Sequence, residues 1–414
     1  MALSLHRYTN RLPNPNYPLF QLLKHRTRVE REKSMLIYIA PENGNRLPEN
    51  VLIEILTWLP VKEVLQYKSV CKSWYSILSS PQFISKHLKN NRHRYIDNCL
   101  LALFPVTSAE SNLCELLIDE TPRVLEDKVL YGIPEYGAYI CGPCDGLYYL
   151  CAYSYRALWN PSINEVRTLP PIIITHQSPT LPIYAFWDWY NFGVDPVTGD
   201  YKVVVIYDYI DDNEVRYPLS VFVYSLRTDS WKYCGDLAHR YDLVNNKCYF
   251  LVNGCCFWLS NNFDSPELII SFDMTSDSFQ ELPIPNYQRP ASNCLGMYEE
   301  SIAFFSVHEG DGILFIWTLN HGMWTKKFTI GSIPDNCIPI GHWNYNKVFL
   351  QQFEGRRLVL CDPNTLEIKD LGYNGPGRCM GLFCYMESLL SIKDNMNKCR
   401  EDEQEQVETD ITQV

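Results

Sequence analysis

The chain has 414 residues, of which 46% are hydrophobic, 14% aromatic and 20% charged, and its formal net charge is −12 at pH 7. This composition predicts one or two globular domains with sizeable cores. No stretch approaches about 18 uninterrupted apolar residues, and the N-terminus has no apolar signal core, so the sequence argues against membrane insertion and secretion. It favours an intracellular protein, cytoplasmic or nuclear, whose 16 irregularly spaced cysteines are buried thiols rather than a disulfide framework.

The two ends differ from the rest of the chain. Residues 1–34 carry seven basic and two acidic side chains, and subtracting this +5 from −12 leaves −17 for residues 35–414. Such a basic arm is compatible with a transit peptide or a nucleic-acid tail, but its prolines and lack of a helical stripe favour a disordered extension over residues 1–44, or an upstream start ahead of Met35. Residues 393–414 are polar and acidic and predict a solvated, disordered tail.

Residues 45–90 predict a small helical domain. Pro48 and Pro60 each follow a leucine, and a proline at the first helical position gives up an N–H that has no helical partner. Apolar residues recur at helical spacing from Val51 to Leu59 and again from Val64, and a third helix is predicted over Trp74 to Leu78. A unit of about 40 residues buries too little surface to be stable by itself. The apolar stripe therefore predicts packing against another chain or another domain.

These residues resemble the F-box of plant F-box proteins. The matching motifs are Leu47-Pro48-Glu49, Ile53-Glu54-Ile55-Leu56, Leu59-Pro60-Val61, Val70-Cys71-Lys72-Ser73-Trp74, Phe83 and His87. The resemblance implies a three-helix F-box that docks onto a Skp-type adaptor and, through it, a cullin-based ubiquitin ligase. It implies an adaptor-facing or supporting role for Leu47, Pro48, Ile55, Leu59, Pro60, Val64, Val70 and Trp74. The alternative is a helical subdomain that packs on the rest of this chain alone.

A repeat runs through residues 95–392. Five copies of a strand–turn–strand pattern align on Trp159, Tyr224, Phe272, Trp317 and Cys361. Their offsets are 65, 48, 45 and 44 residues, and a degraded copy lies at 114–125. Periods of about 40 to 50 residues are typical of four-stranded propeller blades, so the sequence predicts a mainly β fold with about six kelch-like blades. The run from Met380 to Ile392 is expected to close the ring by pairing with the first blade. The alternative is a stack of antiparallel sheets that does not close.

This region resembles the F-box-associated domain of plant F-box proteins. The similarity rests on Cys144-Asp-Gly-Leu, Leu158-Trp-Asn-Pro-Ser, Phe192-Gly-Val-Asp-Pro-Val-Thr-Gly-Asp-Tyr-Lys-Val-Val204 and Val223-Tyr-Ser-Leu-Arg-Thr-Asp-Ser-Trp231. Some sequence motifs, such as Trp324-Thr-Lys-Lys-Phe-Thr-Ile330, are similar to motifs of the S-locus F-box proteins of self-incompatibility and of their S-locus-like paralogues. That narrower similarity implies a basic ribonuclease as the target.

The sequence holds no strong catalytic signature. It contains no G-x-S-x-G elbow, no phosphate-binding G-x-x-x-x-G-K-[ST] loop and no H-E-x-x-H motif. The pair Cys141 and Cys144 has redox spacing, but the residues that follow predict a strand rather than the helix start that activates such a thiol. Cys255 and Cys256 are neighbours that should point to opposite faces of a strand, which argues against a shared zinc site. We expect no catalytic residue, no metal and no cofactor.

Acidic side chains suggest what the propeller binds. Asp208, Asp211, Asp212 and Glu214 are predicted to share one loop, and Glu309 and Asp311 another. Such loops attract basic partners, and the −17 balance argues against nucleic acid. The favoured interpretation is a non-catalytic substrate receptor of a ubiquitin ligase with a protein target, basic by this argument. The alternatives are a propeller enzyme such as a glycoside hydrolase, and an F-box scaffold or decoy that works outside any ligase.

Overall fold

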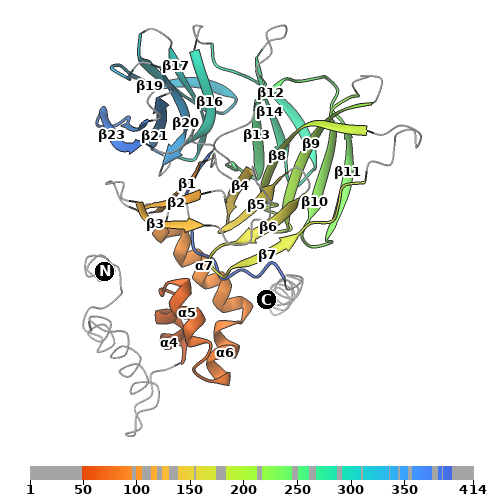
Figure 1. Ribbon diagram of the computed structural model, residues 1–414, viewed down its shortest axis with the longest axis vertical. Coiled ribbons are helices and arrows are strands. Elements are labelled where there is room, and N and C mark those ends of the chain that lie inside the picture. Colours follow the sequence, from red (N-terminus) through yellow and green to blue (C-terminus); the bar gives the residue numbers. More distant parts are fainter. Residues whose placement is uncertain are drawn as a thin grey trace, which may run out of the picture. The chain divides into compact units, whose positions relative to one another are not determined.

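The computed structural model describes residues 49–95, 99–104, 113–118, 124–129, 139–152, 155–173, 183–211, 217–244, 250–260, 267–286, 291–308, 311–334, 336–343, 346–352, 357–374, 381–384 and 386–393 (Figure 1). The chain forms two compact units. The first contains the described residues up to Leu59 together with Glu63–Phe83, and the second contains Pro60–Lys62 and the chain from Ile84 onward. The predicted disordered extension 1–44 lies outside the described residues, and so does the predicted tail 393–414 apart from Lys393.

Four helices, rather than the predicted three, occupy the described part of the F-box-like region. They are α4 (Glu49–Leu56), α5 (Val61–Tyr67), α6 (Lys72–Leu78) and α7 (Pro81–Tyr95). Helix α5 begins directly after Pro60, as predicted. The sequence prediction missed α7, although Pro81 stands at its first position and the hydroxyl of Ser80 accepts a hydrogen bond from the N–H of Phe83 at 3.3 Å. Phe83, His87 and Asn91 are buried and recur every four residues along it.

The described strands form six four-stranded antiparallel sheets, which we number as blades 1 to 6. Blade 1 contains β24 (Gly381–Cys384), β1 (Cys99–Phe104), β2 (Leu113–Ile118) and β3 (Val124–Val129). Blade 2 contains β4 (Tyr139–Cys144), β5 (Leu147–Cys151), β6 (Arg156–Asn160) and β7 (Glu165–Thr168), and blade 3 contains β8 (Ile183–Val194), β9 (Tyr201–Asp211), β10 (Ser220–Ser225) and β11 (Ser230–Asp236). Blade 4 contains β12 (Leu243–Val244), β13 (Cys255–Ser260), β14 (Leu268–Asp273) and β15 (Ser278–Pro283). Blade 5 contains β16 (Ala291–Tyr298), β17 (Ser301–His308), β18 (Ile313–Asn320) and β19 (Met323–Ile330), and blade 6 contains β20 (Cys337–Trp343), β21 (Lys347–Gln352), β22 (Arg357–Asp362) and β23 (Glu367–Asn374).

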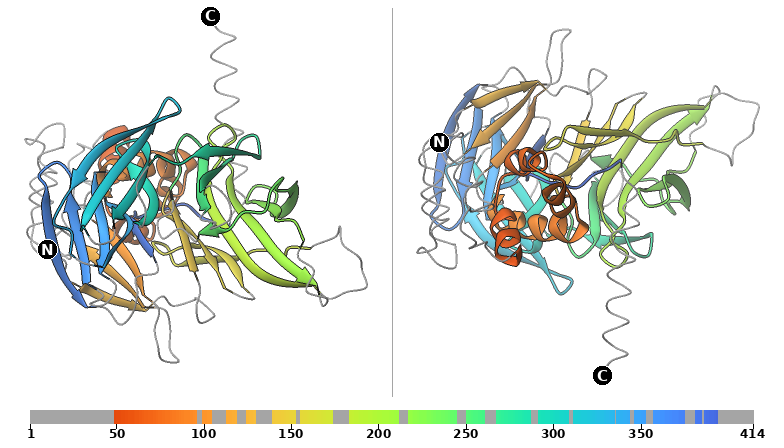
Figure 2. Two further views of the ribbon diagram at one scale, coloured as in Figure 1. Left: turned by 90° about the horizontal axis from the view of Figure 1, so that it is seen from above. Right: turned by 90° about the horizontal axis from the view of Figure 1, so that it is seen from below.

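The blades close into a ring. Each blade contributes an inner strand that neighbours the inner strands of the blades on either side, in the cyclic order β24, β4, β8, β13, β16, β20 and back to β24 (Figure 2). In blade 4, β13 takes this place because β12 has two residues. The ring is sealed by β24, which pairs antiparallel with β1 from the other end of the propeller. The predicted closure is confirmed, and the alternative of an open stack of sheets is wrong.

Hydrophobic clusters fill the spaces between the blades. Alternate side chains of one strand enter different clusters, because successive residues point to opposite faces of a sheet. Cys256 packs in the cluster that joins blades 3 and 4, whereas Cys255 packs against the cluster that joins blades 4 and 5. The predicted opposite orientation of these two thiols is confirmed.

The predicted repeat unit is the hairpin between the third and fourth strands of a blade. Its anchors Trp159, Tyr224, Phe272, Trp317 and Cys361 lie in β6, β10, β14, β18 and β22, and the degraded copy covers β2 and β3. Each of these hairpins in blades 2 to 6 has a residue with a positive φ in its turn: Asn164, Asp229, Asp277, His321 and Leu366. The long first period, 65 residues, contains the longest strands of the ring, β8 with 12 residues and β9 with 11.

Candidate functional site

The helical region combines an internal core with apolar surface. Val64, Trp74 and Leu78 are buried, and the rings of Tyr67 and Trp74 meet edge to face with centroids 5.6 Å apart. Leu59 is also buried. Three of the predicted adaptor-binding residues, Leu59, Val64 and Trp74, therefore support the helices from inside.

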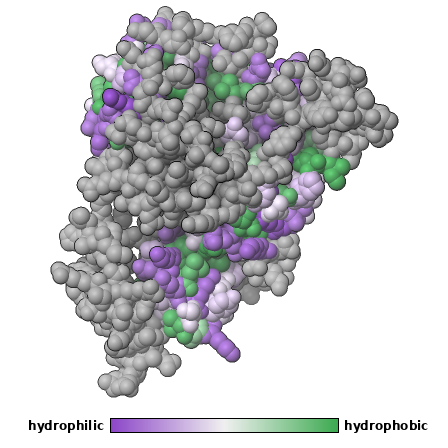
Figure 3. Space-filling view, in the orientation of Figure 1, coloured by the Kyte–Doolittle hydropathy of each residue, from purple (hydrophilic) through white to green (hydrophobic). Residues whose placement is uncertain are grey.

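Other predicted residues reach the surface. Val70, in the turn between α5 and α6, is 42% exposed, whereas Ile55 and Pro60 are half-buried. Leu47 and Pro48 lie outside the described residues. In the space-filling view, apolar and polar surface is interspersed over the helices (Figure 3).

Tyr75 was missed by the sequence analysis. It lies in α6 and is 61% exposed, which is unusual for a large aromatic residue. Its neighbour Trp74 is buried, and successive residues of a helix point about 100° apart, so one of the two rings had to face outward. This adjacency is the signal that would have found it. Val70 and Tyr75 together form what we call the exposed apolar pair.

The propeller has two different faces. On the turn face lie the hairpins that join the first and second strands and the third and fourth strands of a blade, such as β8–β9 and β10–β11. On the loop face lie the connections between the second and third strands, such as β9–β10 and β17–β18, together with the connections between blades. This follows from the antiparallel order within each blade and the ring order of the blades.

The acidic residues are placed differently from the prediction. Asp208 and Asp211 lie in strand β9 rather than in a loop. The side chain of Asp208 is 5% exposed and forms an ion pair with Arg240, so its charge is neutralised inside the fold. Its predicted place in a loop is wrong, because β9 continues four residues further than the apolar run had indicated.

The remaining acidic positions divide between described and undescribed segments. Asp212, Glu214 and Glu309 lie outside the described residues. Asp311 is described, and its side chain is 66% exposed, with a carboxylate oxygen 3.1 Å from Nδ1 of His308. The ends of β9 and β17 both point to the loop face. The topology therefore brings the described residues Asp211 and Asp311 to the same face of the ring, and a substrate-facing role for these two residues stays a prediction.

The cysteines with redox spacing are packed inside blade 2. Cys141 and Cys144 both lie in β4 and are buried. Burial raises the pKa of the Cys141 thiol well above its ordinary value, and the pKa of Cys151 rises for the same reason to about 12. A thiol with a raised pKa is a poor nucleophile at neutral pH. Within the described ranges, no group of three or more histidine, cysteine, aspartate or glutamate side chains is arranged to hold a metal ion.

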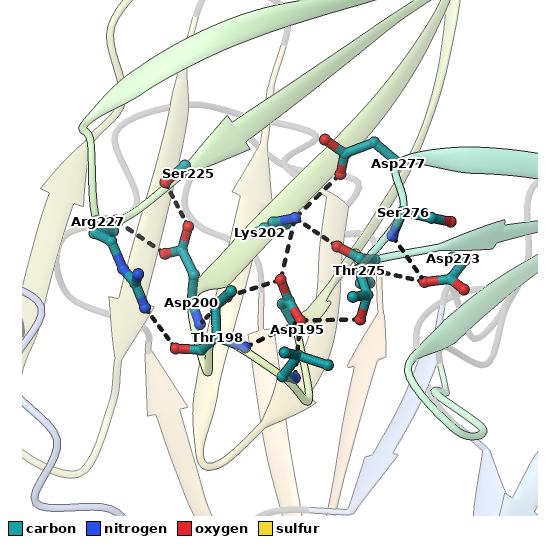
Figure 4. Close-up of polar contacts among 12 residues, drawn as sticks. Asp195, Thr198, Asp200, Lys202, Ser225, Arg227, Asp273, Thr275, Ser276 and Asp277 are labelled. Carbon is teal, nitrogen blue, oxygen red and sulfur yellow. Dashed lines mark hydrogen bonds and ion pairs between the residues drawn. The ribbon is translucent and has the colours of Figure 1, made fainter. Parts of the chain in front are cut away.

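A polar network joins blades 3 and 4 on the turn face (Figure 4). The ammonium group of Lys202 lies 3.4 Å from a carboxylate oxygen of Asp195 and 3.1 Å from one of Asp277, and it also donates to the carbonyl oxygen of Met274. Burial acts to raise the pKa of Asp195, but hydrogen bonds from the Thr198 hydroxyl and the N–H groups of Val197 and Thr198 lower it to about 2. The Asp-Pro-Val-Thr-Gly-Asp-Tyr-Lys motif thus forms a junction between blades.

No helix in the described part of the chain has the length and apolarity that a membrane crossing requires.

Two family models that match this chain agree with this architecture. The family described as F-box associated beta propeller domain matches residues 105–392, and the F-box domain family matches residues 45–86. Among similar proteins of Arabidopsis thaliana, the putative F-box protein At3g10430 is 28% identical over 58% of this chain and 62% of its own length. The putative F-box protein At3g22650 is also 28% identical, over 56% of this chain and 60% of its own. The matched part thus spans about three fifths of these relatives. The solved structure of TolB from Acinetobacter baumannii aligns with a TM-score of 0.44 and 11% identity over 73% of this chain and 72% of that chain.

Proposed function

Because the chain belongs to the family of plant F-box proteins with an F-box-associated β-propeller domain, we propose that it is the substrate-recognition subunit of a Skp–cullin–F-box ubiquitin ligase. In this proposal the F-box docks onto a Skp-type adaptor, and the propeller binds a protein that is to receive ubiquitin and be degraded. The observation that carries the proposal is the joining of an F-box with exposed apolar side chains to a closed propeller in one chain.

The exposed apolar pair supports the first part of the proposal, binding to a Skp-type adaptor. Val70 and Tyr75 expose 42% and 61% of their surface. Large apolar side chains at such positions are typical of protein interfaces, in which a few buried residues supply most of the binding free energy. Leu59, Val64 and Trp74 would hold the helices that present them. In this proposal the exposed residues contact the adaptor, and the buried residues stabilise the helices that carry them.

The loop face of the propeller is the proposed target-binding surface. Loops vary independently of the scaffold that carries them, so they are suited to selecting a partner. The chain's net charge of −12 and the exposed carboxylate of Asp311 support a basic protein as the target. The narrower hypothesis of a basic ribonuclease in self-incompatibility rests on the similarity to S-locus F-box proteins. A cytoplasmic or nuclear location belongs to the same proposal.

The chain itself would perform no chemistry. A ligase subunit of this kind holds a lysine of its target near the charged ubiquitin carrier, which makes a bimolecular reaction effectively intramolecular. A glycoside hydrolase would instead need two carboxyl groups about 5 to 9 Å apart in a central cleft. In the polar network on the turn face, the carboxylates of Asp195 and Asp277 are paired with Lys202, which supports a structural role for these two residues. An F-box scaffold outside any ligase is tested by the same experiment as the main proposal.

Reconstitution tests the proposal. The full chain is mixed with a Skp-type adaptor, a cullin with its RING subunit, the ubiquitin-activating and -conjugating enzymes, and a set of basic and acidic reporter proteins. We expect ubiquitin transfer to a basic reporter, weakening as salt is raised. Adaptor binding without transfer to any protein recovered with the propeller would favour the scaffold, and hydrolysis of a glycoside by the chain alone would favour the enzyme.

A further inference from the structure

The segment Met386–Lys393 follows the closing strand β24 and runs across the turn face of blade 2. Its residues Ser388, Leu389, Leu390 and Ile392 are all at least 90% buried. Leu390 and Ile392 belong to the hydrophobic cluster of blades 2 and 3, against which Ile84 and Leu88 of α7 also pack. The segment and the part of α7 from Ile84 onward thus share one core inside the second unit of the chain. We call residues 386–393 the C-terminal strap.

Asn160 holds the strap with its amide group. This residue is the last of strand β6 and is fully buried. Its Nδ2 donates hydrogen bonds to the carbonyl oxygens of Ser388 at 3.1 Å and Leu390 at 2.8 Å. Its Oδ1 accepts the N–H of Ser162 at 2.9 Å and so forms the turn between β6 and β7. One side chain therefore shapes the hairpin and binds the strap.

Blades 3, 4 and 6 join their third and fourth strands by a turn of the same length as blade 2, with Ser225, Asp273 and Asp362 at the position of Asn160, whereas the shorter turn of blade 5 follows Asn320. Asp273 in blade 4 and Asp362 in blade 6 end the third strand of their blades, and each carboxylate accepts the N–H groups of the turn that follows. The turn itself is satisfied by an aspartate. An aspartate has no N–H to donate and would face two carbonyl oxygens at position 160. The amide at Asn160 is therefore required by the strap and not by the hairpin.

Three further side chains of blade 2 bind the strap. A carboxylate oxygen of Glu165 accepts the N–H of Ile392 at 2.9 Å and the hydroxyl of Ser391 at 3.0 Å. Arg167 donates to the carbonyl oxygen of Ile392 at 2.9 Å. The hydroxyl of Ser162 accepts the N–H of Ser388 at 3.0 Å. Gly146 lies so close that a Cβ there would come within 2.6 Å of the Cβ of Ser388.

The strap also contacts α5 and α7, at one residue of each helix. The carboxylate of Glu387 accepts the N–H of Val61, the first residue of α5, at 2.9 Å. An acceptor at this position satisfies a helical N–H that has no partner within its helix. The carbonyl oxygen of Glu387 accepts a hydrogen bond from the amide of Asn91 in α7 at 3.3 Å. Val61 and Asn91 both belong to the second unit.

We propose that the C-terminal strap is a device that fixes the first residue of α5 and the part of α7 from Ile84 to Asn91 to blade 2, with the amide of Asn160 as its anchor. Ring closure by β24 and attachment by the strap are separate functions of neighbouring residues. The contacts of the strap all lie within the second unit of the chain, so this proposal does not depend on the ligase function.

Hydrogen–deuterium exchange on the full chain tests the strap whether or not the ligase function holds. Asn160→Asp keeps the turn acceptor and removes both donors to the strap. We expect exchange about tenfold faster at the N–H groups of Ser388 and Ile392 and in α7 from Ile84 to Asn91, with no change in β17 and β18. Asp273→Asn is the matched control, since it makes the reverse exchange at a turn without a strap, and it should change none of these rates.

Faster exchange in the strap with unchanged exchange in α7 would overturn the proposal, as would no change in either. If Asn160→Asp unfolds the propeller, which faster exchange in β17 and β18 would reveal, Glu387→Ala decides. This variant leaves blade 2 untouched and should speed exchange at Val61 and in α7. Unchanged exchange at both places in Glu387→Ala would likewise overturn it.

Discussion

The indole Nε1 of Trp231 donates a hydrogen bond to the carbonyl oxygen of Pro170 at 2.7 Å. Trp231 is the second residue of β11, the outer strand of blade 3, and Pro170 follows β7, the outer strand of blade 2. Trp324 of blade 5 makes the same bond to Pro283 of blade 4 at 2.6 Å. In both cases a tryptophan near the start of an outer strand donates a hydrogen bond to the carbonyl oxygen of a proline at or just after the end of the preceding blade's outer strand. Trp231 ends the sequence motif 223–231 and Trp324 begins the motif 324–330, so each motif supplies a hydrogen bond between neighbouring blades.

Trp231→Phe is expected to lower the free energy of unfolding by about 1 to 2 kcal/mol, because the hydrogen bond to Pro170 is lost and the ring is smaller. Trp317→Phe is the control, since the N–H of Trp317 is buried without a hydrogen-bond partner among the described residues. Trp317→Phe should therefore lower the free energy of unfolding by less than Trp231→Phe does. Urea unfolding of both variants measures the difference, and equal losses would argue that packing rather than the hydrogen bond holds the blades.

Leu366 is held in an unfavourable backbone conformation. Its φ is +60°, in the turn where blades 2, 3 and 4 have Asn164, Asp229 and Asp277, and its side chain is 61% exposed. A left-handed conformation costs a leucine about 1 kcal/mol more than glycine or asparagine. Leu366→Asn should therefore raise the midpoint of thermal unfolding by a few degrees, with a free-energy gain of roughly 0.5 to 1 kcal/mol. Ile173→Asn, at a residue that is 72% exposed and has no positive φ, should give no such gain.

His342 should make the protein less stable in mild acid. Its pKa is lowered by burial from 6.5 to about 4, and its Nδ1 accepts the N–H of Met297 at 3.1 Å. Below pH 6.5 the unfolded chain binds a proton that the folded chain does not, so the free energy of unfolding decreases by up to about 3 kcal/mol as the pH falls to 4. The contribution is absent above pH 6.5.

His342→Gln should flatten this part of the pH profile while leaving other acid-sensitive groups in place. Asp195 does not confuse the measurement, because its pKa is lowered to about 2 and its stabilising effect is lost below pH 3.8. Unfolding free energies measured between pH 4 and 7 for both proteins provide the test. Parallel profiles would show that another group titrates.

Val70→Asp should weaken adaptor binding at least tenfold, because it places an unpaired charge in a proposed apolar contact. Val70 is exposed, so the free energy of unfolding should change by no more than about 0.5 kcal/mol. Leu59→Ala is expected to weaken binding through the fold instead, with a loss of stability of roughly 2 to 5 kcal/mol. Val197→Asp, at a propeller residue that is 76% exposed, should leave adaptor affinity unchanged. Isothermal titration with the adaptor separates the three.

Much of this fold could be predicted from its repeats. The five aligned anchors locate the third strand of five blades, because hairpins with the same turn chemistry recur at blade length. The inner strands were harder to locate in the sequence. In blade 4, for example, β12 has two residues, and β13 takes its place beside the inner strands of the neighbouring blades. Helix α7 was missed because its buried stripe includes the polar residues His87 and Asn91, which a search for apolar periodicity does not detect.

The candidate site was predicted only partly. The motif residues Leu59, Val64 and Trp74 proved to be buried, because a family motif preserves the core of a domain as well as its surface. Exposure of Tyr75 depends on the rotation of α6 in the packed domain, and the pairing of Asp208 with Arg240 joins residues 32 positions apart. Such long-range relationships do not leave a local pattern in the sequence. The strap is similar, since Asn160 contacts residues more than 200 positions away.

The proposed binding of this F-box protein to a Skp-type adaptor can be tested without any substrate. The purified full chain is mixed with the adaptor at equal concentration, and the mass of the eluting species is measured by light scattering. We expect one peak with the mass of a one-to-one complex. Two separate peaks at micromolar concentration, from a chain shown to be folded by its near-ultraviolet circular dichroism, would contradict it.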